Sequence, residues 1–486
     1  MRQFLTDHGH GGGAVLTKRK LMLGGAGLAC SACLPWQARS SAMEGADLAD
    51  AFSLDDLARR TFNYFWELAD ARTGLVPDRW PTPSFASIAA VGFALTAYPY
   101  GVMRGWVTRA EARERTLTTM RFFATAPQGT AASGMAGHNG FFYHFLDMQS
   151  GTRFGTCELS TIDTALLVAG VLFAGQYFDH DEPQETEIRA LADAIYARVD
   201  WQWALGSASF MSMGWHPESG FIASQWDIYN EAMILHMLAL GSPTHAVDPA
   251  LWGRLTGRFA AAWGRHWGED YIHFPAMLAH QYSHVWIDFR GIQDAFIRAR
   301  GIDYFENSRR ATIAQRNYAI TNAGAWTGYG PDIWGWNACD GPGDFAANIG
   351  GRRREFFSYS ARGPGDRDDG TITPSAAGGS IAFAPELASR ALRTMHDRYG
   401  RVIYGQYGFF DSFNPTLADA SGIALRHGRI EPGLCWVDGD YLGLDQGPII
   451  SMIANGRDDF VWRHMRANPH IRRGLAAAGF GGGWLG

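Results

Sequence analysis

The stretch Ser160-Thr-Ile-Asp-Thr-Ala-Leu-Leu-Val-Ala-Gly-Val-Leu-Phe-Ala-Gly175 decides the fold class. It opens with a serine, which is a preferred helix-capping residue, and its later residues are apolar on almost every side of a helix. A helix without a polar face has to be covered all round by other elements. The stretch therefore predicts a buried helix at the centre of a helix-rich fold.

Segments before and after this stretch predict further helices around it. Residues 53–70 begin with a capping serine and repeat apolar side chains at near-helical spacing. Thr108 and Glu111 form a capping-box signature before a helix that reaches about Phe123. Further helices are expected near residues 185–203, 226–240, 249–266, 291–316, 381–399 and 446–467.

Long loops rich in Gly, Pro, Asp and aromatic residues separate these helices. They cover residues 71–87, 126–158, 204–225, 267–290, 322–380 and 400–445. Loops of this length are usually functional when their host is compact. Short β-hairpins are expected within 140–147 and 401–411. No change in composition marks a linker, so residues 45–486 are expected to form a single all-α domain of stacked helical hairpins, open or closed into a toroid.

Composition narrows the classes of function. The chain has 486 residues, of which 47% are hydrophobic and 19% charged, and its net charge is -6. This balance is globular and lacks the basic field that nucleic acid binding needs, so no nucleic acid partner is expected. The only lysines are Lys18 and Lys20, so the chain beyond its leader has no amine for a Schiff base, pyridoxal phosphate or a P-loop. No cofactor is expected.

The pattern also argues against a metal site. His280, His284 and Asp288 follow one another at intervals of four residues and would share one face of a helix. Their surroundings rich in Gly and Pro make a helix there doubtful, so packing or sugar contact is the preferred interpretation.

Residues 1–42 have the pattern of an export signal. Lys18, Arg19 and Lys20 precede a short apolar run at 21–29, and small residues at 40–42 offer a cleavage site. The basic residues and the Gly-rich run are similar to a twin-arginine signal, and a Sec signal is the alternative. The run is too short to span a bilayer and no later stretch is long enough, so we expect no membrane span and a periplasmic or secreted protein.

Eight blocks of sequence, in order along residues 50–470, carry a resemblance to a known family. They include Trp-Asp-Ile-Tyr-Asn-Glu at 226–231, and the full set is 155–167, 226–231, 280–288, 307–312, 329–336, 369–374, 407–415 and 436–448. The set resembles the bacterial glucoamylase-like family that includes endo-β-1,2-glucanases, and it is similar to the glucoamylase-like domain of cyclic β-1,2-glucan synthases. The resemblance implies an (α/α)6 toroid with long loops and short β-hairpins at the active-site mouth, and an oligo- or polysaccharide partner, a glucan.

Hydrolysis of a glycosidic bond needs two carboxyl groups, one protonated as general acid and one ionised as base or nucleophile. Glu231 is the first candidate for the acid, because aromatic neighbours could raise its pKa by burial, and the resemblance also implies this role. A first-turn glutamate stabilised by the helix dipole is the alternative. Asp445 is the candidate base, and Asp438 and Asp440 compete for the same role.

Two further carboxylates lie around the start of the buried helix. The resemblance places Glu158 in the acidic set at the sugar-binding mouth, and a loop carboxylate near a helix end is the alternative. Asp163 follows Ser160 at the spacing of a cap partner and is also retained as a sugar contact. A separation of about 5 Å between catalytic carboxyls would mean retention, and about 6.5–9.5 Å inversion. The resemblance favours inversion of the anomeric configuration, whereas the relatives linked to synthases act with retention of it.

Sugar sites pair flat aromatic rings with polar side chains, because pyranose faces are apolar and their edges are polar. Core packing is the alternative for any single tryptophan. The aromatic side chains expected in the glucan groove are Trp226, Tyr229, Tyr282, Trp286, Trp334, Trp336, Tyr407 and Trp436. The polar contacts expected there are Asp163, His284, Asp288, Arg309 and Asp440.

These features together predict an exported glycoside hydrolase, with endo action on β-1,2-glucan as the first hypothesis. An exo-acting glucosidase or glucoamylase on other gluco-oligosaccharides is one alternative. A lyase or epimerase on the same toroid, or a non-hydrolytic glycan-binding protein, are the others. New reducing ends, unsaturated or isomerised sugars, or no product at all would distinguish them.

Overall fold

The computed structural model describes residues 52–419 and 422–486, so the export signal expected over residues 1–42 lies outside the described residues. Within these ranges the helices are α3 (Leu54–Leu68), α4 (Ile88–Met103), α5 (Arg109–Thr125), α6 (Thr161–Tyr177), α7 (Pro183–Ala197), α8 (Trp201–Leu205), α9 (Met233–Gly241), α10 (Ala250–Phe259), α11 (Leu278–Trp286), α12 (Ala295–Arg298), α13 (Tyr304–Thr321), α14 (Pro374–Gly378), α15 (Pro385–Ile403), α16 (Gly443–Asp458), α17 (Phe460–Met465) and α18 (Pro469–Ala477).

The strands are short and all pair antiparallel. Strands β3, β4, β6, β7 and β8 form one sheet in that order. The bounds are β1 (Arg79–Trp80), β2 (Ala86–Ser87), β3 (Gly137–His138), β4 (Phe141–Tyr143), β5 (Phe145–Leu146), β6 (Leu159–Ser160), β7 (Gly214–His216), β8 (Gly220–Phe221), β9 (Trp263–His266), β10 (Glu269–Ile272), β11 (Ala338–Cys339), β12 (Phe345–Ile349), β13 (Arg352–Phe356), β14 (Ser360–Ala361), β15 (Tyr404–Gly405), β16 (Gly408–Phe409), β17 (Phe413–Asn414), β18 (Arg429–Glu431), β19 (Cys435–Val437) and β20 (Tyr441–Leu442).

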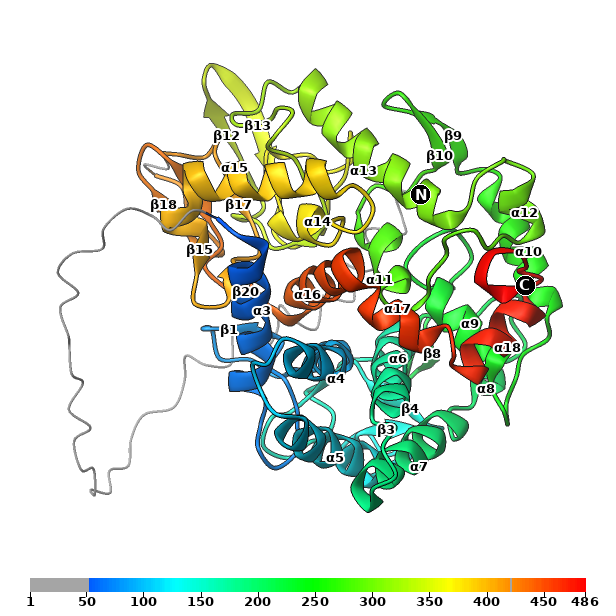
Figure 1. Ribbon diagram of the computed structural model, residues 1–486. Helices are drawn as coiled ribbons and strands as arrows, with labels where there is room; N and C mark the ends of the chain where they lie inside the picture. Colours follow the sequence, from blue (N-terminus) through cyan, green and yellow to red (C-terminus); the bar gives the residue numbers. More distant parts are fainter. Residues whose placement is uncertain (1–51, 420–421) are drawn as a thin grey trace, which may run out of the picture.

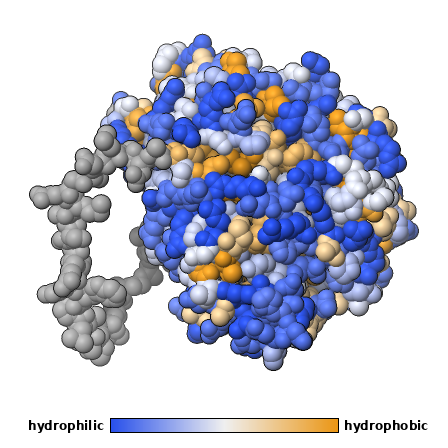
Figure 2. Space-filling model, in the orientation of Figure 1, coloured by the Kyte–Doolittle hydropathy of each residue, from blue (hydrophilic) through white to orange (hydrophobic). Residues whose placement is uncertain are grey.

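The helices form a toroid with an inner and an outer layer (Figure 1). In the inner layer α4 packs on α6, α6 on α9, α9 on α11, α11 on α16, and α16 on both α14 and α4, so the succession of contacts closes on itself. Helices α3, α5, α7, α13, α15 and α18 pack against this ring from outside. The surface in the same orientation is mostly hydrophilic, with apolar patches towards its middle (Figure 2).

Helix α6 confirms the buried helix that the decisive stretch predicts. The Ser160 side chain accepts a hydrogen bond from the Asp163 backbone, and every residue from Thr161 to Gly175 is buried. Helices α4 and α6 approach closely because Gly92 and Gly170 face each other there; a Cβ on either would collide with the opposite backbone. The absence of these two side chains therefore sets the distance between two inner helices.

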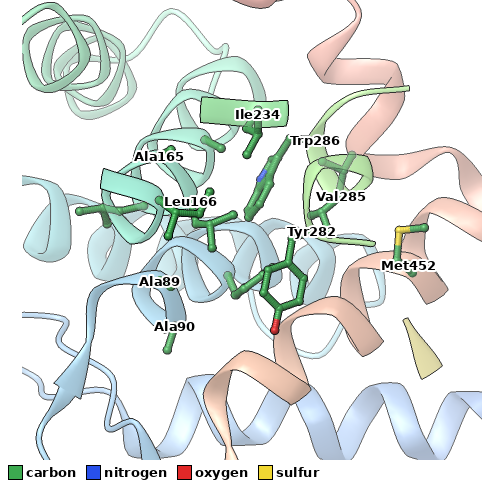
Figure 3. Close-up of a cluster of buried hydrophobic side chains, with 14 of the residues drawn as sticks. Ala89, Ala90, Ala165, Leu166, Ile234, Tyr282, Val285, Trp286 and Met452 are labelled. Atoms are coloured by element: carbon green, nitrogen blue, oxygen red, sulfur yellow. The ribbon is translucent and has the colours of Figure 1, made fainter. Parts of the chain in front are cut away.

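Small and aromatic side chains from the inner helices fill the centre of the toroid. Figure 3 shows Ala89 and Ala90 of α4, Ala165 and Leu166 of α6, Ile234 of α9, Tyr282, Val285 and Trp286 of α11, and Met452 of α16 in one cluster. Trp286 stacks on Phe93 with ring centroids 5.1 Å apart. The core cluster that contains them extends along the chain from Phe52 to Phe480. No helix within the described ranges is both long and apolar enough to cross a membrane.

Several helices agree with the sequence and others differ from it. Ser53 caps α3, and Thr108 and Glu111 complete the capping box of α5, as predicted. The pattern gave no sign of α4, which is apolar on all sides and contains glycine and proline. It also missed α11, which lies within the loop expected at 267–290, and it placed the start of α9 too early.

Candidate active site

Acidic side chains gather around the N-terminal ends of three inner helices. Asp163 lies in the first turn of α6, Asp445 lies in the first turn of α16, and Glu231 precedes α9. All three side chains are buried. The N-terminal end of a helix carries a partial positive charge, so it is a favourable place for carboxylates.

Glu231 has the properties of a carboxyl group that keeps its proton. Its relative exposure is 9%, and its carbonyl oxygen accepts a 2.6 Å hydrogen bond from Ser283 Oγ, which fixes the backbone there. Burial, reinforced by the negative charge of Asp163, raises the pKa of Glu231 to about 7 against a weaker opposing effect of its own backbone amide. A large fraction of this group is therefore protonated at neutral pH and able to donate a proton.

His144 holds two of the other carboxylates together. Its Nδ1 lies 2.8 Å from Glu158 Oε1, and its Nε2 lies 3.4 Å from Asp163 Oδ2. Burial alone would lower the pKa of His144, but the charges of Asp163, Glu158 and Asp78 outweigh it and raise the pKa to about 9. At neutral pH the ring is therefore a cation that donates from both nitrogens.

The same cation has the opposite effect on Glu158. Burial acts to raise the pKa of this carboxyl, but the charge and hydrogen bond of His144 outweigh it and lower the pKa to about 2. Glu158 is thus ionised whenever Glu231 is available as an acid. Two nearby carboxyl groups are given different protonation states by their surroundings, which is how acid and base roles are separated in many active sites.

Asp163 combines two roles that the sequence left open. Its backbone amide donates to Ser160 Oγ, and Ser160 Oγ in turn donates to Asp163 Oδ2, so it is a helix-cap partner. The same carboxylate contacts His144 and acts electrostatically on Glu231. The cap therefore fixes the position of a carboxylate that adds to the effect of burial on the pKa of Glu231.

A second group of carboxylates surrounds Asp445. Arg79 Nη1 donates to Asp340 Oδ2 at 2.5 Å and lies 3.7 Å from Asp440. The backbone amide of Asp340 donates to Asp411 Oδ2 at 2.7 Å. These carboxyl groups and that of Asp438 are buried, so one arginine faces an excess of acidic groups. Some of them must hold protons for the cluster to be stable.

Asp411 and Asp445 are two buried carboxyl groups that each shift the pKa of the other, as carboxyls that share one proton do. One of the two must then be protonated. Burial, with the charges of Asp445, Asp438 and Asp340, raises the pKa of Asp411 well above its ordinary range. Burial also raises the pKa of Asp445, to about 6, and the polar groups of Ser375 and Asp411 act against this rise. Asp411 thus keeps the shared proton, and Asp445 is the ionised member at neutral pH.

The Tyr282 hydroxyl is affected by charges from both groups of carboxylates. Its ring packs in the core cluster of Figure 3, and its hydroxyl donates to Leu444 O at 3.4 Å. Burial raises the pKa of Tyr282 well above its usual value, and the charges of Asp445, Glu231 and Asp163 all contribute in the same direction. The candidate acid and the candidate base therefore both act electrostatically on one hydroxyl group.

Comparisons with known proteins identify the family of the chain. Residues 223–469 match the family model Glycoamylase, described as "Putative glucoamylase". The chain belongs to this family. The resemblance drawn from the sequence blocks is thereby confirmed.

Relatives and solved structures of this glucoamylase family match most of the chain. An "Exo beta-1,2-glucooligosaccharide sophorohydrolase (non-reducing end)" of Parabacteroides distasonis is 28% identical over 462 residues, which cover 88% of this chain and 58% of that relative. A "putative glucoamylase" structure from Bacteroides uniformis is 28% identical with a TM-score of 0.77, covering 90% of this chain and 100% of its own. An endo-β-1,2-glucanase from Chitinophaga pinensis, in complex with sophorotriose and glucose, shares the fold with a TM-score of 0.73 at 24% identity and the same coverages.

The structure places most of the expected groove aromatics inside the core of this family member. Their relative exposures are 3% or less, and a ring without an exposed face cannot stack on a sugar. They are Trp226, Tyr229, Trp286, Trp334, Trp336, Tyr407 and Trp436. Several polar atoms of these rings bond within the protein; for example, Trp286 Nε1 donates to Thr96 Oγ1 at 3.0 Å and Trp436 Nε1 to His427 O at 2.9 Å.

Three of the polar side chains expected to contact sugar instead make contacts within the protein. His284 Nε2 lies 3.0 Å from Ser308 Oγ in the core. Asp288 is buried between two arginines, Arg290 and Arg466, outside α11. Arg309 pairs with Glu306 of its own helix, α13. Asp440 is different, because Thr82 N donates to its Oδ1 at 3.0 Å within the carboxylate cluster around Asp445.

Sequence reasoning missed residues that only the fold brings to the site. They are Arg79 in strand β1 and His144, Asp340 and Asp411 in separate loops, and none of them stands out by local sequence alone. Asp411 does fall inside the block 407–415, so treating every acidic residue of the blocks as a candidate would have found it. The exposed aromatic rings within the described ranges are Trp80, Phe221 and Tyr359, none of which the composition argument selected.

One residue group near the site resembles a set of metal ligands. Asp340, His427 and Asp438 each offer an atom, and these atoms lie within 4.8 Å of one another. Asp340 Oδ2 is already engaged by Arg79, which supplies the positive charge at this point. The group therefore fits an arginine–carboxylate cluster better than a metal centre.

Proposed function

We propose that this protein is a glycoside hydrolase that cleaves β-1,2-glucan, with Glu231 as general acid and Asp445 as general base. One observation carries the proposal: two buried carboxyl groups at the N-terminal ends of inner helices have pKa values of about 7 and about 6, and the charges of both act on the Tyr282 hydroxyl. Such a pair suits a reaction that needs one protonated and one ionised carboxyl.

The steps follow from these protonation states. Glu231 donates its proton to the glycosidic oxygen as the bond to the anomeric carbon breaks. Asp445 accepts a proton from the water that attacks this carbon, so one new reducing end forms for each bond broken. Glu158, held ionised by His144, accepts a hydrogen bond from a sugar hydroxyl and orients the substrate.

The names of relatives support β-1,2-glucan as the substrate. The Parabacteroides distasonis sophorohydrolase acts on β-1,2-gluco-oligosaccharides by its name, and the Chitinophaga pinensis enzyme is named an endo-β-1,2-glucanase. Endo action is the first candidate, in line with the name of the Chitinophaga pinensis enzyme. The second candidate is exo release of sophorose, which the 28% identity to the sophorohydrolase favours.

The architecture and location belong to the same proposal. Pairing each inner helix with an outer one gives an (α/α)6 toroid, with the N-terminal ends of the inner helices forming the mouth that holds the carboxylates. The basic residues, apolar run and small residues of 1–42 support export to the periplasm or beyond.

A linkage panel tests the proposal. Purified protein is incubated with β-1,2-, β-1,3-, β-1,4- and α-1,4-glucans, and products are read by mass and by reducing ends. We expect cleavage of the β-1,2-glucan, with a ladder of products for endo action and only sophorose for exo action. Products of unsaturated mass would mean a lyase, and full turnover by Glu231→Gln would remove Glu231 from the acid role.

A further inference from the structure

Tyr359 is an aromatic side chain that the fold leaves exposed beside the acidic cluster. Its relative exposure is 46%, whereas most of the aromatic residues expected to bind sugar are 3% exposed or less. It lies in the short segment between β13 and β14. An exposed ring of this size near buried carboxylates needs an explanation, because the burial of such a ring in a core would be favourable.

The strand register places Tyr359 next to Asp340. In the β11–β14 pair, Ala338 faces Ala361 and Cys339 faces Ser360. One further step along both chains brings Asp340 opposite Tyr359. The Asp340 side chain accepts a hydrogen bond from Arg79, and the Asp340 backbone amide donates to Asp411. The Tyr359 ring therefore lies at the edge of the carboxylate cluster.

The surroundings of the hydroxyl agree with this position. The pKa of Tyr359 is raised by the protein around it and by the charges of Asp340, Asp411 and Asp78. The hydroxyl thus stays protonated and can donate a hydrogen bond. The ring is thus accessible to water while the charges of three carboxylates act on its hydroxyl, which places it at the surface of the acidic cluster.

A buried ion pair fixes the backbone that carries Tyr359. Arg362 and Asp369 have no exposed side-chain surface and lie 2.9 Å apart. Arg362 donates to the carbonyl oxygens of Phe357 and Ser358, and Asp369 accepts from the Phe357 amide. A buried ion pair is costly unless all its bonds are made, as they are here. The segment is therefore rigid, and Tyr359 is its outward-facing member.

We propose that Tyr359 forms a sugar subsite beside Asp445, its ring packing on a pyranose face and its hydroxyl bonding a sugar hydroxyl. The ligand class is a neutral gluco-oligosaccharide. The proposal rests on the proposed function for its substrate, and it adds a binding residue that neither the sequence blocks nor the family match assigns. Arg362 and Asp369 act as positioning residues for this subsite.

The test compares Tyr359→Phe and Tyr359→Ala with the wild type, and Ile320→Ala serves as a matched control because its side chain is 48% exposed on the outer helix α13. Initial rates on β-1,2-gluco-oligosaccharides give kcat and KM. Calorimetry gives the affinity of each protein for sophorose.

We expect Tyr359→Ala to raise KM and weaken sophorose binding by roughly tenfold, and Tyr359→Phe by about two- to fivefold, through the lost ring contact and hydroxyl bond respectively. The control, Ile320→Ala, should match the wild type in both KM and affinity for sophorose. Melting temperatures should stay unchanged, because the ring is exposed.

Unchanged KM and unchanged sophorose affinity in Tyr359→Ala would overturn the subsite, as would a fall in kcat alone. If the wild type cleaves no glucan in the linkage panel, the proposed hydrolase function fails by itself. In that case calorimetry with sophorose, cellobiose and laminaribiose still decides the subsite: wild-type binding that Tyr359→Ala weakens supports it, and binding that is equal in both proteins, or absent, overturns it.

Discussion

His144 Nδ1 lies 2.8 Å from Glu158 Oε1, and this ion pair separates the protonation states of the carboxyl groups in the candidate site. It keeps Glu158 charged, whereas burial and the charge of Asp163 favour the protonated form of Glu231. The imidazole ring also stacks on Phe145 with centroids 3.8 Å apart, so its position is fixed by packing as well as by charge.

The His144–Glu158 pair should make stability fall at alkaline pH. The pKa of His144 is about 9 in the folded protein, above its unfolded value, so its contribution is complete below about pH 6.5 and is lost as pH rises through 9. Because both side chains are partly exposed, we expect a loss of only about 1–2 kcal/mol in the free energy of unfolding over this range.

Urea unfolding at pH 6, 7.5 and 9 measures this contribution. His144→Asn should lack the alkaline loss, while His245→Asn, which changes a partly exposed histidine, should keep the wild-type slope. Equal slopes for His144→Asn and the wild type would contradict the ion pair.

Glu231→Gln should be more stable than the wild type at alkaline pH. The folded pKa of about 7 lies above the unfolded value, so the wild type pays for ionising a buried carboxyl as pH rises from 4.5 through 7. Glutamine carries no such charge. We expect a relative gain of about 2–3 kcal/mol at pH 8 compared with pH 4, measured by the same unfolding curves. Glu355→Gln, on an exposed side chain, is the control, and a constant difference across pH would argue against a buried, protonated Glu231.

The activity should depend on pH as a narrow bell. An ionised Asp445 is required above its pKa of about 6, and a protonated Glu231 below its pKa of about 7. The plot of kcat/KM against pH should therefore peak between these values, and each limb reports an apparent constant of the interacting groups. A flat profile from pH 5 to 9 would be inconsistent with this pair of roles.

The sequence predicted those parts of the fold that local patterns specify. Ser53, Thr108 and Ser160 cap helices where the capping rules place them, because a cap is a contact between residues a few positions apart. Helix α4 was not predicted, because a helix that is buried on all sides shows no apolar stripe in its sequence.

The candidate site was predictable only where a single residue carried the signal. Glu231 and Asp445 come from acidic residues in distinctive blocks. His144 and Arg79 act through partners far away along the chain, and no local pattern reveals such contacts. The tryptophans were ambiguous for a related reason: aromatic residues in glycine-rich segments can be either buried or exposed, and only tertiary packing decides between them.

Asp411 should influence the pKa of the candidate base, Asp445, through the proton that the two carboxyl groups share. Asp411→Ala removes a polar group that lowers the pKa of Asp445, so the acidic limb of the pH profile should move to higher pH. Asp411→Asn keeps an N–H donor and should move the limb less, which makes it the matched control. Identical limbs for Asp411→Ala and the wild type would show that the two carboxyls do not share a proton during turnover.

Trp286 should prove to be a structural residue and not a sugar contact. Its ring has no exposed surface, stacks on Phe93 and donates to Thr96, so Trp286→Phe leaves a small void and removes one hydrogen bond to the Thr96 hydroxyl. We expect a loss of about 2–4 kcal/mol in the free energy of unfolding, with KM unchanged in the protein that remains folded. Trp80→Ala, at an exposed tryptophan, should lower stability by less than about 1 kcal/mol. A raised KM for Trp286→Phe at unchanged stability would return this ring to the glucan groove.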